Sequence, residues 1–167
     1  LDRFKNRKNS EIKLNPDEIL FLGEVYKFQF MPELGRKYEI NDGDKIISSG
    51  ENLILNGVLD KWYKKEAKTI LDERLRFFAG KYNFKYNKVF IRGQKTRWGS
   101  CSGKMDLSFN WRLIQTPMYI IDYIVVHELA HTTIFNHTKS YWQKVGSIYP
   151  DYKQANRWLK SFHLGLG

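Results

Sequence analysis

The stretch IDYIVVHELAH, residues 121–131, is an apolar run that ends with His127, Glu128 and His131 within five residues. Burying such polar side chains costs free energy unless each one finds a partner. At 3.6 residues per turn, His127 and His131 lie about 40° apart on one face of a helix, one turn above the other. Their ring nitrogens can therefore point at one metal ion, at the ~2.0–2.1 Å that Zn–N bonds require.

A catalytic zinc site needs a third protein ligand and an open position. His137 follows His131 by six residues and immediately precedes Thr138, a predicted helix N-cap, so a turn there would bring its ring back toward the pair. His163 is the weaker candidate, because nothing in the pattern constrains its position. Glu128 is expected to act as the base that takes a proton from a metal-activated water, as in other H-E-x-x-H proteins.

The alternative is that hydrogen bonds within the core satisfy the histidines and that no metal binds. A third histidine close behind an apolar helix favours the metal site over this alternative. A metal-binding module without activity would have no use for Glu128. We therefore expect Zn²⁺ bound by His127, His131 and His137, with Glu128 as the catalytic residue.

Helical periodicity extends on both sides of this segment. A helix is predicted over residues 117–134, with Pro117 at its first position. Apolar residues at steps of three and four predict a backing helix over 57–80. Two shorter helices are predicted after His137, over 138–146 and 151–163.

Strand patterns occupy two other parts of the chain. Residues 19–56 alternate between apolar and polar side chains and predict a small antiparallel β-meander, with NDGD at 41–44 as a hairpin turn. Residues 88–93 and 105–114 predict two strands of a small antiparallel sheet that packs on the metal-binding helix.

The expected fold is α+β, with three parts. Residues 1–18 form a polar N-terminal tail or helix remnant, 19–56 a β-rich accessory region, and 57–167 a zincin-like catalytic domain. Cys101 is the only cysteine, which excludes an internal disulfide and fits the reducing cytoplasm. The sequence contains no run of about 18 apolar residues, so no membrane span is predicted.

The charge is uneven along the chain. Residues 1–56 carry nine lysines and arginines against ten acids, whereas 57–167 carry nineteen against eight. Basic side chains alternate with aromatic ones over 81–112, which suggests an anionic partner such as nucleic acid. No base-reading motif is present, so such binding would depend on phosphates and on salt. A solvated basic surface that keeps the protein in solution explains the charge about as well.

Several side chains are candidates for contact with a substrate. Arg97, Trp98 and Asn110 lie near the two predicted strands and are candidates for binding substrate, although core packing is favoured for Trp98 and a plain surface charge for Arg97. An extended peptide is expected to pair with a strand edge around 105–111. The donor that stabilises the oxyanion is sought among three tyrosines: Tyr141, Tyr149 and Tyr152.

Five blocks in order resemble one known family: RWGSC at 97–101, NWRLI at 110–114, VVHELAH at 125–131, NHTKSYW at 136–142 and YPDYK at 149–153. Together they resemble the YgjP-like metallopeptidases, which are related to the SprT-like and WLM zinc proteases. The resemblance covers about residues 19–165 and implies the same zinc ligands and the same catalytic Glu128. It also implies further sequence before Leu1.

The sequence thus predicts a cytoplasmic zinc metallopeptidase that acts on polypeptides. It does not indicate an oligomeric state. The second hypothesis is a nucleic-acid-associated, SprT-like protein, either a protease or a binding module, that uses the basic surface of 81–112. The resemblance to SprT-like proteases, which act on DNA-bound proteins, makes it more attractive. Both hypotheses can hold together.

Overall fold

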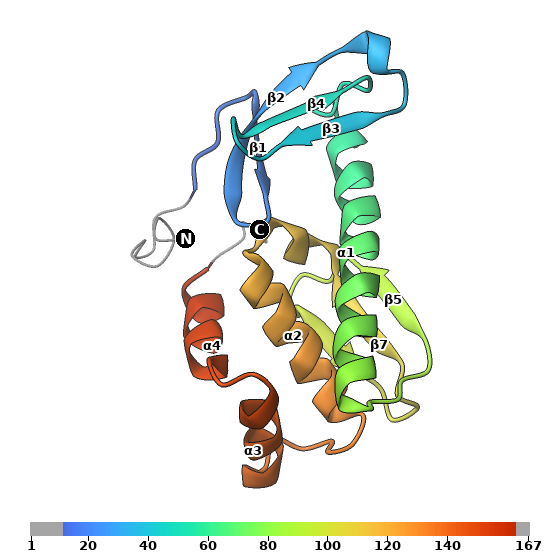
Figure 1. Cartoon of the computed structure of the whole chain (residues 1–167), viewed down its shortest axis with the longest axis vertical. Coiled ribbons are helices and arrows are strands. Elements are labelled where there is room, and N and C mark those ends of the chain that lie inside the picture. Colours follow the sequence, from blue (N-terminus) through green and yellow to red (C-terminus); the bar gives the residue numbers. More distant parts are fainter. Residues whose placement is uncertain (1–11, 163–167) are drawn as a thin grey trace.

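The computed structural model describes residues 12–162, which form an α+β fold with two small sheets and four α-helices (Figure 1). Most of the predicted tail over 1–18, and all of His163, lie outside the described residues. The chain first builds a four-stranded sheet, then a long helix, a three-stranded sheet and three further helices. Two short 3₁₀ helices interrupt this order: η1 (Pro32–Leu34) and η2 (Trp111–Gln115).

The N-terminal sheet has the strand order β1-β2-β4-β3. Its strands are β1 (Glu18–Phe21), β2 (Glu24–Phe30), β3 (Tyr38–Asn41) and β4 (Ile46–Ser49). β2 pairs with β4 in parallel, so the predicted antiparallel meander over 19–56 is wrong in its topology. Met31 N donates to Ser49 O (2.9 Å) and Gly50 N donates to Lys37 O (3.1 Å). The end of β4 therefore lies between the two ends of the β2–β3 loop, which keeps β2 and β3 from pairing.

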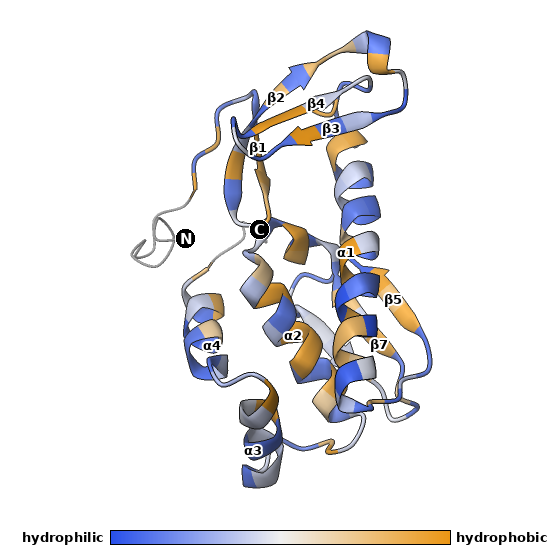
Figure 2. Ribbon diagram, viewed as in Figure 1, coloured by the Kyte–Doolittle hydropathy of each residue, from blue (hydrophilic) through white to orange (hydrophobic). Residues whose placement is uncertain are grey.

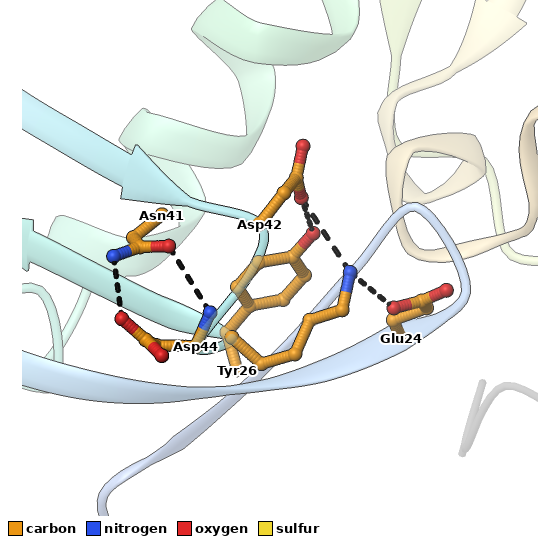
Figure 3. A network of polar contacts seen from close by, with 6 residues as sticks. Glu24, Tyr26, Asn41, Asp42 and Asp44 are labelled. Atoms are coloured by element: carbon orange, nitrogen blue, oxygen red, sulfur yellow. Dashed lines mark hydrogen bonds and ion pairs between the residues drawn. The ribbon is translucent and has the colours of Figure 1, made fainter.

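The turn between β3 and β4 is held by polar contacts within the turn and by an ion pair with the start of β2 (Figure 3). Asn41 Nδ2 donates to Asp44 Oδ2 (2.8 Å), and Asn41 Oδ1 accepts from Asp44 N (3.0 Å). Lys45 Nζ lies 2.5 Å from Glu24 Oε2. β3 and β4 pair antiparallel on either side of this turn, which confirms the hairpin predicted at 41–44.

The second sheet has the strand order β5-β7-β6 and lies next to α2 (Met118–His131), the helix that carries His127 and His131. Its strands are β5 (Val89–Arg92), β6 (Gly99–Cys101) and β7 (Leu107–Asn110). β6 and β7 are antiparallel, but β5 and β7 are parallel, so the predicted all-antiparallel sheet is wrong for that pair. β7 is the central strand and all four of its residues are buried, because both of its faces are covered.

The four helices are α1 (Val58–Tyr82), α2 (Met118–His131), α3 (Lys139–Ile148) and α4 (Tyr152–Ser161). α2 contacts α1, α3, α4 and β6. A helix surrounded in this way must be apolar almost all round, and hydrophobic residues recur along α2 in Figure 2. Arg74 of α1 clamps Asp122 of α2 with two hydrogen bonds, of 2.5 and 3.0 Å. α2 is thus fixed among its neighbours.

Buried apolar side chains from both ends of the chain form one continuous cluster. Tyr63 of α1 stacks on Trp111 with ring centroids 5.8 Å apart. Leu22 N donates to Ile114 O (2.8 Å), which joins the β1–β2 turn to η2.

The division of the chain near residue 57 stays a prediction. Among the described helices, none is both long and apolar enough to cross a bilayer.

Candidate metal centre

The end of α2 brings three histidine rings together. His127 and His131 lie one turn apart, with ring centroids 5.0 Å from each other. The helix ends at His131, three residues before its predicted end, and the following turn returns His137 to the pair. His131 Nε2 lies 3.0 Å from His137 Nε2, which lies 3.2 Å from His127 Nε2. The structure therefore places together the three residues that the spacing predicted as ligands.

The hydrogen bonds of this cluster fit a bound cation. His131 Nδ1 lies 3.1 Å from Ile134 O, and a carbonyl only accepts, so Nδ1 carries the proton and Nε2 presents a lone pair. The three Nε2 atoms face one another, and hydrogen bonds among them alone cannot give each atom a partner. Tetrahedral Zn–N bonds place neighbouring nitrogens about 3.3 Å apart, close to the distances found here. The three rings thus suit a metal ion such as zinc.

Burial keeps the imidazoles of His127 and His131 in the neutral form that binds metal. The pKa of His127 is lowered to about 3, first by burial and then by the nearby His131 and His137. Burial also lowers the pKa of His131. Neutral rings near pH 7 let a metal bind without first displacing a proton from the ligand nitrogen.

Helix α3 supports the rings from the side. Tyr141 is fully buried, its ring stacks on His131 at 4.5 Å, and its hydroxyl donates to His127 O (2.9 Å). Trp142 stacks on His137 with ring centroids 5.5 Å apart. α3 begins as predicted, because Thr138 Oγ1 accepts from Tyr141 N (3.4 Å). The N-cap thus sets where Tyr141 and Trp142 meet the histidines.

Glu128 follows His127 in α2 but faces the sheet. Its side chain is buried, with 4% exposed, and its carboxylate packs on Gly99 of β6. A Cβ at position 99 would lie 2.6 Å from Glu128 Oε1, so only glycine leaves room for the carboxylate. Burial raises the pKa of Glu128 to about 8 in the metal-free chain. A bound cation would lower that pKa again, because a nearby positive charge favours the carboxylate.

This raised pKa predicts how the metal-free protein responds to pH. Above about pH 6.5 the unfolded chain has released the Glu128 proton while the folded chain still holds it, so the free energy of unfolding falls as pH rises toward 8. The fall is at most about 1.4 kcal/mol per pH unit. Urea unfolding at about pH 6.5 and pH 8 measures it, with Glu128→Gln as the control that removes the titrating group. Identical pH dependence in the two proteins would contradict the assignment.

The residues predicted to contact substrate fall into different environments. Asn110 is fully buried, and its Nδ2 donates to Gln94 O (2.7 Å) and Arg97 O (3.1 Å) while its Oδ1 accepts from Arg112 N (3.1 Å). Both amide hydrogens are thus used to hold the loop before β6, which does not fit the predicted contact with a bound peptide. Arg97 is exposed and Trp98 is half-buried, so both stay candidates beside β6.

The three candidate tyrosines are now distinguishable. The Tyr141 hydroxyl is engaged by His127 O, and the Tyr149 hydroxyl donates to Tyr119 O (2.8 Å). The Tyr152 hydroxyl forms no hydrogen bond with any residue in the described range 12–162. Of the three, only Tyr152 keeps a free donor.

Two residues beside the centre were missed by sequence reasoning. Gly99 has no helical or strand periodicity that marks it, because its role depends on a contact with Glu128 across the fold. Tyr123 packs edge-on against His127 with ring centroids 5.8 Å apart and is 2% exposed. Its position four residues before His127 on one helix face was the signal that could have found it.

Three histidine nitrogens that converge near a buried glutamate define a candidate metal centre of the kind that metal-dependent hydrolases use. The sequence profile of the YgjP-like family, described as a metallopeptidase domain, matches residues 1–162, and the chain belongs to this family. Neither the curated proteins nor the solved structures contain a match to the chain. Family membership implies a metallopeptidase with a polypeptide substrate.

Proposed function

We propose that this protein is a zinc-dependent, zincin-like peptidase in which His127, His131 and His137 hold the metal and Glu128 is the catalytic base. The convergence of the three Nε2 atoms carries the proposal. When bound, Zn²⁺ supplies Lewis acidity, which makes a water more acidic and a scissile carbonyl more electrophilic. A set of three nitrogen ligands with one open position is typical of catalytic zinc sites.

Glu128 performs the proton transfers in this proposal. Its carboxylate takes a proton from the attacking water and returns that proton to the leaving amine. Because Gly99 has no Cβ, it leaves room for this carboxylate beside β6. Tyr141 keeps the ring of His131 in its ligating orientation through stacking.

An extended peptide would pair with β6 in this arrangement. The edge predicted around 105–111 is not free, because β7 is the central strand between β5 and β6. β6 is an edge strand, contacts α2 and includes Gly99 next to Glu128. Main-chain pairing along β6 would therefore bring a scissile bond close to the base. Arg97 and Trp98, just before β6, would contact the same peptide.

Removing the metal is expected to abolish hydrolysis. A chelator such as ortho-phenanthroline should stop cleavage of casein by the purified protein, and added zinc should restore it, since the ligands are otherwise intact. The readout is release of fluorescent peptides from labelled casein, with Glu128→Gln as the blank for contaminating proteases. Cleavage that survives complete metal removal would contradict a metal-dependent mechanism.

The basic surface of 81–112 supports a second, nucleic-acid-associated function less strongly. Its lysines and arginines are mostly exposed, but Phe84 belongs to the buried core and only Phe90 is a clearly exposed aromatic, with Arg92 over its ring at 5.0 Å. Binding would therefore rest on phosphate contacts. Filter binding at low salt tests this binding, and no affinity there would exclude it.

A cytoplasmic location also stays a prediction.

A further inference from the structure

A cavity lies far from the histidines, where the first turns of α1 meet β3, β4 and the turns between β4 and α1. It encloses about 430 Å³, within the size range of small-molecule sites. Figure 1 shows β3 and the start of α1 at one end of the molecule and α3 at the other. This α1 cavity is thus separate from the metal centre.

The wall of the α1 cavity contains polar atoms without partners. Trp62 is 6% exposed, and its Nε1 is buried without a hydrogen-bond acceptor among the described residues. Asn52 Oδ1, also in the wall, is buried without a donor. A buried N–H group without an acceptor destabilises the protein, and a ligand oxygen would supply the missing acceptor. Both atoms belong to residues that line the cavity, so a ligand that reaches them would supply one acceptor and one donor that the protein lacks.

The aromatic rings of the cavity are held in place before any ligand enters. Trp62 packs against Phe21 at 5.2 Å and meets the ring of Tyr38 edge-on at 5.7 Å. The Tyr38 hydroxyl donates to Glu66 Oε1 (2.6 Å) and is therefore not available to a ligand. Leu55 and Val58 form an apolar part of the cavity wall, so an apolar part of a ligand fits beside the polar atoms.

The charges around the α1 cavity select for an anion. Arg36, Lys61 and Lys65 line it, against Glu51 as the one lining acid. Within the described residues, none of these three cations forms an ion pair. A ligand anion would have three cations to contact without breaking an ion pair. Lys65 Nζ also lies over the ring of Tyr38, 5.4 Å from its centroid.

We propose that the α1 cavity binds a small organic anion with an apolar, ring-sized body and a hydroxyl group. The carboxylate or similar anionic group accepts from Trp62 Nε1 and lies among Arg36, Lys61 and Lys65. The hydroxyl donates to Asn52 Oδ1, and the apolar body lies against the ring of Tyr38. This site is independent of the proposed peptidase activity.

NMR of the indole N–H groups tests the proposal on the full chain, with the Trp62 signal assigned among five tryptophans by Trp62→Phe. The probes are para-hydroxybenzoate, its neutral amide and inorganic phosphate. We expect para-hydroxybenzoate to give a saturable shift of the Trp62 signal, and the amide and phosphate to bind at least about tenfold more weakly. No saturable shift up to about 10 mM, or equal affinity for the amide or phosphate, would overturn the proposal.

Charge variants provide the matched control. Lys61→Ala combined with Lys65→Ala should weaken binding of para-hydroxybenzoate about tenfold or more, because two of the three cations are lost. Lys68→Ala removes an exposed cation of the same helix that does not line the cavity and should leave binding unchanged. Equal binding by the double variant and wild type would contradict the assigned site.

Discussion

Glu128→Gln is expected to lower kcat/KM for peptide hydrolysis by about 10²–10⁴-fold while the metal stays bound. The amide has the shape of the carboxyl group, so it fits the space beside Gly99, but it cannot accept a proton from water. The fold should also survive, because Glu128 is buried and its pKa is already raised toward the neutral form. Hydrolysis rates and metal content measured on the same samples test both parts.

The matched control is Glu73→Gln, which changes an exposed glutamate of α1 outside the metal centre. It should hydrolyse peptides as wild type does. A Glu128→Gln protein whose kcat/KM stays within about threefold of wild type would show that another group takes the proton.

Gly99→Ala is expected to lower kcat/KM about 100-fold or more without loss of metal. The new Cβ would lie 2.6 Å from Glu128 Oε1 and 2.8 Å from its Cγ, so the carboxylate must move. The backbone at Gly99 is not in the left-handed region, so alanine adds no backbone strain there. The clash falls on the Glu128 side chain from its Cγ to its carboxylate. The change thus displaces the base rather than the fold.

Gly103→Ala is the control for this substitution. A Cβ there would meet no atom within 4 Å, and its backbone is likewise outside the left-handed region. It should leave kcat/KM, metal content and the urea midpoint unchanged. A Gly99→Ala protein with full activity and bound metal would show that the position of Glu128 does not depend on this contact.

Local periodicity was enough to predict that His127, His131 and His137 lie together. The spacing of His127 and His131 follows from 3.6 residues per turn, and the N-cap at Thr138 limited the turn that brings His137 back. The arrangement of the three histidines thus depends largely on residues close in sequence. The same holds for α1, whose amphipathic pattern gave nearly its observed bounds.

Features that depend on distant parts of the chain were not predictable in this way. Strand alternation does not say which strands pair, so the parallel pairs β2–β4 and β5–β7 were missed. Asn110 alternates onto the polar face of its strand, yet it is buried because it bonds a loop that precedes it by more than ten residues. Gly99 is recognisable only once Glu128 is placed against it.

The most direct test of the account is the metal content of three purified proteins: wild type, His137→Ala and His163→Ala. Mass spectrometry should find about one zinc per chain in wild type and in His163→Ala, and much less in His137→Ala. That result would establish both the metal and its third ligand. A His137→Ala protein that keeps its zinc, or a wild type that binds no metal when zinc is offered, would contradict the three-histidine site.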